Sequence, residues 1–146
     1  MIQRIQSVFL LIASICLGGL YLLPLGGSKL PVAETSYSDS ILNINDYTLL
    51  QVLIPIGAVL FLISIFLYSN RKVQTIIATI GAVVIGIITG FVAMRIFKSM
   101  EMLTGENAFI WKPGVALPIV SLIFAILASR AIKKDDKLVK SMDRLR

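Results

Sequence analysis

Residues 73–94 read VQTIIATIGAVVIGIITGFVAM, and this run of 22 residues without a charged side chain decides the fold. A helix of roughly 20 apolar residues crosses the hydrocarbon core of a bilayer. Three further uncharged runs, of 24, 24 and 17 residues, occupy 5–28, 47–70 and 113–129. The 14 basic and 8 acidic residues all lie between or beyond these runs. The pattern predicts a membrane protein whose spans are helices, because helices satisfy their own backbone hydrogen bonds in lipid.

The composition predicts the same class. Hydrophobic residues make up 57% of the chain and its mean hydropathy is +0.89, which leaves too little polar surface for a soluble protein. We therefore expect an all-α membrane protein with one domain, a four-helix transmembrane bundle with spans at about 5–25, 49–68, 73–97 and 113–131. The first run is interpreted as a span and not as a signal peptide, because no clear small-residue cleavage motif ends it.

The loops predict the orientation of the bundle. If the N-terminus is on side one, ten of the 14 cations lie on that side and four on the other. The positive-inside rule then makes both termini cytoplasmic, with outer loops at 26–48 and 98–112 and a cytoplasmic tail at 132–146. Aromatic residues near the expected span ends fit the headgroup regions: Tyr21, Tyr47, Tyr68, Phe109 and Trp111.

The connections and prolines predict further details. Spans two and three are separated by so few residues that they form a tight antiparallel hairpin. Pro55 with Gly57 predicts a kink in span two, and Pro118 a kink in the outer half of span four. Span three should tilt or protrude outward if it continues to Phe97. The first outer loop is expected to be irregular, or a short strand or turn on the membrane surface. Its role is either a periplasmic contact or a simple connection.

Span three carries a face of small residues. Ala78, Ala82, Gly86 and Gly90 recur at a spacing of four, and the last two form a GxxxG motif. Small residues let a second helix approach closely where lipid supplies no hydrophobic driving force. Two interpretations remain open: an interface with a partner protein or a second copy, and packing inside this bundle.

The last helix is expected to continue beyond Ser129 as a basic amphipathic extension that lies on the anionic cytoplasmic leaflet. The alternatives are a tail that only sets the topology and a tail that docks on an acidic protein or RNA, for which the sequence has no specific motif. The candidate contacts to lipid or a partner on the cytoplasmic side are all cations: Arg4, Arg71, Lys72, Lys133, Lys134, Lys137, Lys140, Arg144 and Arg146.

The spans lack the groups that most catalysis and coupled transport require. They contain no Asp, Glu, His or Lys, and the chain has no His and one cysteine, Cys16. We find no phosphate-binding glycine loop, GxSxG or HExxH motif, so we expect no enzyme, no cofactor and no metal site. Arg95 lies near the outer end of span three and is expected to snorkel to the headgroups, with Glu101 and Glu106 as candidate ion-pair partners.

Both ends of the chain resemble one family. The sequences MIQRIQSVFL at 1–10 and AIKKDDKLVKSMDRLR at 131–146, with Trp-x-Pro-Gly at 111–114, resemble small inner-membrane proteins of Bacteroidota described as a domain of unknown function (family 4293). The resemblance extends over the whole chain. It implies a four-span protein of the bacterial inner (cytoplasmic) membrane and implies no activity.

These observations support two classes of function. The leading hypothesis is a non-enzymatic accessory or structural subunit that binds another membrane protein complex. Its partners would be membrane lipids and a membrane protein or a second copy, with no specific nucleic acid. The alternative is a small transporter, channel or lipid-handling protein, which predicts a cavity lined by Ser, Thr or Gln that reaches the midplane. An intramembrane enzyme has no candidate acid or base.

Overall fold

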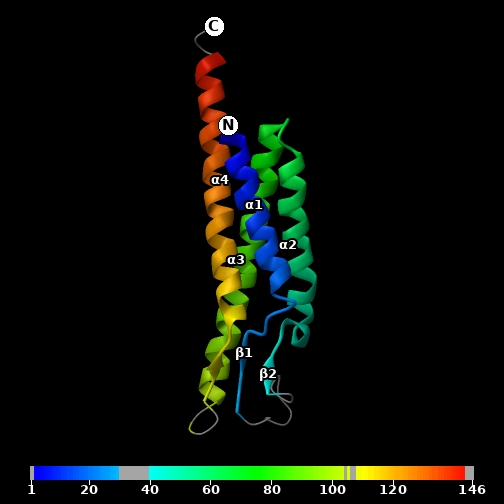
Figure 1. Cartoon of the computed structure of the whole chain (residues 1–146), viewed down its shortest axis with the longest axis vertical. Coiled ribbons are helices and arrows are strands. Elements are labelled where there is room, and N and C mark those ends of the chain that lie inside the picture. The colour runs from blue at the N-terminus through cyan, green and yellow to red at the C-terminus, as the bar shows by residue number, and fades with distance from the viewer. Residues whose placement is uncertain (1, 30–39, 104, 106–107, 144–146) are drawn as a thin grey trace.

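Four helices dominate the computed structural model, which describes residues 2–29, 40–103, 105 and 108–143, with 2–4, 140, 142 and 143 described by their backbone alone. The helices are α1 (Ile2–Gly19), α2 (Thr48–Phe66), α3 (Arg71–Met102) and α4 (Ala116–Asp143). They lie side by side as a bundle with the two chain ends at the same end (Figure 1). The four predicted helices are therefore confirmed.

Among the residues that the structure describes, three helical stretches are long and apolar enough to cross a membrane, namely Thr48–Phe66, Arg71–Met102 and Pro113–Val139. The chain thus fits a membrane protein. Helix α1 contributes a shorter apolar stretch, Ile5–Gly19. Helix α1 ends at Gly19, so residues 20–25 of the span predicted over 5–25 are not helical. Two adjacent glycines at its end have the low helix propensity expected of such a stop.

A small antiparallel sheet follows α1 at the end of the bundle opposite the termini (Figure 1). It consists of β1 (Gly26–Gly27), β2 (Ile41–Leu42) and β3 (Ile110–Trp111) in the order β2-β1-β3. The short strand considered for the first outer loop is confirmed. The all-α prediction is wrong at β3 in the second outer loop, because a two-residue strand has no period to detect.

Each helix packs against two neighbours, so that α1 contacts α2 and α4, and α3 contacts the same two helices. The predicted α2–α3 hairpin is confirmed, since residues 67–70 alone connect them. At every one of these four interfaces a polar side chain donates to a carbonyl of the neighbouring helix. These bonds are Gln6 Nε2 to Ala131 O (3.1 Å), Ser121 Oγ to Ala13 O (2.9 Å), Ser14 Oγ to Ala58 O (3.3 Å), Gln74 Nε2 to Ser64 O (3.1 Å) and Thr89 Oγ1 to Pro118 O (3.4 Å).

Most of the interior is apolar, and one contact in it fixes how closely α2 and α3 approach. Phe61 is fully buried and its ring lies on Gly81. A Cβ atom at Gly81 would come within 2.6 Å of Phe61 Cε1, so the ring occupies the space of the missing side chain.

The two prolines inside the expected spans have different consequences. Pro55 lies within α2 and supplies no N–H to the carbonyl of Gln51. The hydroxyl of Tyr21 donates to that carbonyl at 2.8 Å. Pro118 is the third residue of α4. The N–H of that position has no partner within a helix, so the kink expected at Pro118 has no cause.

The Tyr21 bond predicts a coupled effect of two substitutions. Tyr21→Phe should destabilise the protein by about 1 kcal/mol, because the Gln51 carbonyl loses its donor. In a Pro55→Ala background the alanine N–H supplies that donor, so the same Tyr21 change should cost much less. The coupling is measured by unfolding four proteins in mild detergent: the natural chain, Tyr21→Phe, Pro55→Ala and the double variant. Equal costs in both backgrounds would contradict it.

Helices α3 and α4 are longer than the spans they contain. Helix α3 has 32 residues and continues past Phe97 to Met102 beside the sheet, as the prediction of tilt or outward protrusion assumed (Figure 1). Helix α4 confirms the helical extension as far as Asp143. The extension continues along the line of α4 past the ends of the other helices instead of turning across the bundle (Figure 1).

Candidate interaction surfaces

The cations predicted to lie on the cytoplasmic side fall into three groups. Arg71 is paired: its Nη1 lies 3.2 Å from Asp135 Oδ2 and donates to the Asp135 carbonyl at 3.4 Å. This pair joins the start of α3 to the extension of α4, and Asp135 is a partner that the sequence did not indicate. Four other cations are exposed, namely Lys72, Lys133, Lys134 and Lys137. The side chains of Arg4 and Lys140, and the whole of Arg144 and Arg146, lie outside the described residues.

The small residues of α3 divide between the inside and the outside of the bundle. Ala78 is fully buried and Ala82 half-buried, which agrees with internal packing. Gly86 is half-buried and Gly90 is exposed, and a Cβ atom added at either would have no neighbour within 4 Å. Internal packing therefore does not explain the GxxxG pair. The glycine that packs inside is Gly81, which the spacing of four did not include.

Arg95 is held by aromatic rings. Its guanidinium carbon lies 4.6 Å from the ring centre of Tyr47 and 4.9 Å from that of Phe91. The two rings meet edge to face, with centres 5.6 Å apart. A cation over an aromatic face is stabilised by the ring quadrupole. The Arg95 side chain is thus half-buried between α3 and the start of α2. We had expected it to extend away from the bundle to the headgroups. The sequence feature that could have indicated this contact is Phe91, because residues four apart lie on the same face of a helix.

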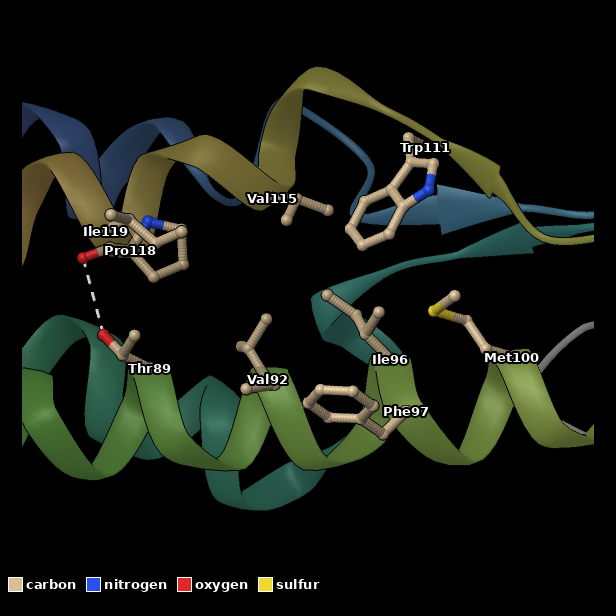
Figure 2. Close-up of a pocket in the computed structure, with 10 residues that line it drawn as sticks. Thr89, Val92, Ile96, Phe97, Met100, Trp111, Val115, Pro118 and Ile119 are labelled. Carbon is tan, nitrogen blue, oxygen red and sulfur yellow. Dashed lines mark hydrogen bonds between the residues drawn. The ribbon is translucent and has the colours of Figure 1, made fainter.

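An apolar groove of about 190 Å³ separates α3 from the start of α4, and we call it the α3–α4 groove (Figure 2). Thr89 contributes a hydroxyl to the groove wall. This hydroxyl donates to the carbonyls of Ile85 at 2.7 Å and Pro118 at 3.4 Å. Several of the lining side chains are largely exposed, so the groove is open to the surroundings. Its lining consists of Thr89, Val92, Ala93, Ile96, Phe97, Met100, Trp111, Val115, Pro118 and Ile119.

The buried polar side chains of the bundle test the transporter alternative, which predicts a cavity lined by Ser, Thr or Gln. The buried Ser64, Gln74 and Ser121 side chains hydrogen-bond to backbone carbonyls of neighbouring helices. A second cavity, of about 240 Å³, lies between α1 and α2 with mostly aliphatic and aromatic walls. In the part of the chain that the structure describes, no three His, Cys, Asp or Glu side chains gather where they could hold a metal ion.

The comparisons with known proteins identify the family. A family model described as Domain of unknown function (DUF4293) matches residues 2–145. The chain belongs to this family. The matched range of the DUF4293 domain includes all four helices and the small sheet, so domain and fold coincide. Neither the curated proteins nor the solved structures contain a match to the chain. The match confirms the family resemblance seen at both ends of the chain. The family description assigns no activity.

Proposed function

We propose that this protein is a non-enzymatic subunit of a bacterial inner membrane, and that it binds another membrane protein through Gly86 and Gly90 of α3. All four helices cross the membrane in this proposal. Both termini lie in the cytoplasm, where ten of the 14 cations collect. The inner membrane of a Bacteroidota species is the proposed location.

The position of the two glycines carries the proposal. Neighbouring exposed positions of α3 bear large side chains, with Val83 59% and Ile87 53% exposed. Gly86 and Gly90 interrupt that surface one turn apart, with open space where their side chains would be. Glycine inside a helix costs about 1 kcal/mol relative to alanine. If the backbone of a partner helix approaches α3 at Gly86 and Gly90, the absence of side chains there has a role, as in small-residue helix contacts in membranes.

The cytoplasmic extension supports the same function. Lys133, Lys134 and Lys137 are exposed near the end of α4 that carries the C-terminus. Such a surface attracts an anionic leaflet or an acidic segment of a partner. Arg71 is excluded from this contact surface because Asp135 already binds it.

The transporter or channel alternative has less support. It needs polar side chains that line a path through the bundle. The buried Ser and Gln side chains described above instead hydrogen-bond between helices, which stabilises a closed bundle.

The test is recovery of a partner from native membranes. The chain purified in mild detergent should carry a membrane protein in stoichiometric amount. Gly86→Leu combined with Gly90→Leu should reduce that amount by about tenfold, which corresponds to about 1.4 kcal/mol of binding free energy. Bulky side chains would hold the partner helix away from the α3 backbone.

Gly18 provides the matched control. It is an exposed glycine of α1 whose added Cβ would also have no neighbour within 4 Å. Gly18→Leu should leave the partner bound. Recovery of the chain alone from native membranes, or equal recovery of the partner with all variants, would overturn the proposal.

A further inference from the structure

The α3–α4 groove crosses the boundary between hydrocarbon and headgroups. Its α3 wall runs from Thr89 to Met100, about 16 Å along a helix that rises 1.5 Å per residue. The uncharged run of α3 ends at Met94, and Arg95 and Lys98 follow. The half of the groove at Thr89 and Ala93 is therefore at hydrocarbon depth, and the half at Phe97 and Met100 is at headgroup depth.

The groove offers an occupant almost nothing but apolar contacts. The single hydroxyl in its wall, on Thr89, is already directed to two backbone carbonyls. The other lining residues of both helices are apolar, and Figure 2 shows them facing one another across the space. Val92, Ile96 and Pro118 form the buried floor, and Phe97 and Ile119 are 69% and 51% exposed at the rim. The rim continues into the apolar surface of α3 and α4 that a bilayer must cover.

One polar donor is available at the headgroup end. Trp111 of β3 lines the groove there, beside Met100 on the opposite wall (Figure 2). Its ring contacts that of Phe109 edge to face, and within the described part of the chain its indole N–H donates no hydrogen bond. The site thus combines an apolar channel with a single donor where it meets the headgroups.

We propose that the α3–α4 groove binds one acyl chain of a phospholipid from the leaflet at the sheet end of the bundle, with the ester carbonyl at the Trp111 indole N–H. An acyl ester has the required form, because it is an apolar chain with an acceptor at its headgroup end. A helix of another protein fits less well, since its carbonyls are already bonded within the helix. The lining carries no cation, so the groove binds anionic and zwitterionic phospholipids alike.

Trp111 is the single tryptophan of the chain, so its fluorescence reports the groove directly. The purified full chain in mild detergent micelles is titrated with phosphatidylcholine whose acyl chains carry bromine, which quenches indole on contact. Quenching should saturate at about one lipid per chain. Ala93→Phe should raise the half-saturating lipid concentration about tenfold, which corresponds to about 1.4 kcal/mol, because the phenyl ring occupies the space that the acyl chain would fill.

Met94→Phe is the matched control, because Met94 is the next residue of α3, is 44% exposed and does not line the groove. It should leave the titration unchanged. An ether-linked form of the same brominated lipid lacks the ester carbonyl and should bind about fivefold more weakly, the value of one net hydrogen bond. If Ala93→Phe does not fold, Ile119→Phe fills the groove from α4 and should have the same effect.

Three results would overturn the proposal. Quenching that rises with the lipid fraction and never saturates would show only general lipid contact. Saturation that is equal in all variants would place the lipid elsewhere. A chain that is dimeric in micelles, with quenching that begins only on dissociation, would show that a second copy fills the groove. The titration needs no partner protein, so its outcome is separate from that of the Gly86 and Gly90 test.

Discussion

Gly114→Ala is expected to destabilise the protein by about 3 kcal/mol, the upper range for inserting a group into packed structure. Gly114 lies in the 3₁₀ turn η3 (Pro113–Val115) that precedes α4, and its N–H donates to the carbonyl of Pro24 at 3.1 Å. A Cβ atom there would meet the Pro24 carbonyl oxygen, lie 2.6 Å from the oxygen of Leu23 and lie 2.8 Å from Pro24 carbon. These are backbone atoms, so no rotation of a side chain can make room.

The loss would extend beyond the turn itself. Residues 23–25 lead from α1 into β1, and Leu25 also donates to the Leu42 carbonyl at 2.9 Å. Moving this segment away from Gly114 would therefore disturb the pairing of β1 with both of its neighbours. The close approach also gives a physical reason for the glycine of the Trp-x-Pro-Gly motif, which was recognised in the sequence without one.

Thermal or denaturant unfolding in mild detergent, followed by circular dichroism, measures this effect. Gly86→Ala is the matched control, because a Cβ atom at Gly86 meets nothing within 4 Å. That variant should be as stable as the natural chain, or up to about 1 kcal/mol more stable through helix propensity. Equal stabilities for Gly114→Ala and the natural chain would contradict the described contact.

Phe61→Ala is the second large effect, with an expected loss of about 2 kcal/mol. Phe61 is fully buried between α2 and α3, and its ring rests on the bare backbone of Gly81. Removing the ring leaves a cavity that the helix backbone cannot fill. The loss is smaller than in a soluble core, because unfolded helices stay in lipid and the transfer of the ring from water contributes nothing.

The Phe61 contact can be tested by a compensating pair. Gly81→Leu alone should destabilise the protein, because its Cβ would lie 2.6 Å from the Phe61 ring. Combined with Phe61→Ala, the leucine enters the vacated space and should restore about 1 kcal/mol or more. Phe66→Ala provides the control, since Phe66 is 78% exposed on the same helix. Purely additive losses at positions 61 and 81 would contradict the packing.

Much of the fold could be predicted from the chain because uncharged runs and charged loops differ so sharply. The runs located all four helices, and the short connection at 69–72 predicted the α2–α3 hairpin. The early end of α1 was not predicted, because residues 20–25 are as apolar as the helix before them. The two-residue strands and the bond from Tyr21 to Gln51 depend on contacts between distant segments, which local patterns do not encode.

The candidate surfaces were harder to predict for a physical reason. A helix in lipid is apolar all round, so its sequence does not indicate which face packs inside. The spacing of four grouped Ala78 with Gly86 and Gly90, although Ala78 and Gly81 face the interior and the other two do not. The Arg71–Asp135 pair joins residues 64 positions apart. The α3–α4 groove depends on how α3 packs against residues 111–119, which no single segment of sequence specifies.

The pairing of α1 with α4 has a consequence for synthesis of the protein. Gln6 bonds to Ala131 and Ser121 to Ala13, over sequence separations of 125 and 108 residues. A ribosome adds about 5–20 residues each second, so α1 waits several seconds for the helix that completes its packing. During that interval α2, through Ser14 and Ala58, is its principal partner. A nascent chain that stops before α4 would expose the buried Gln6 amide to lipid, which marks the product for quality-control proteolysis.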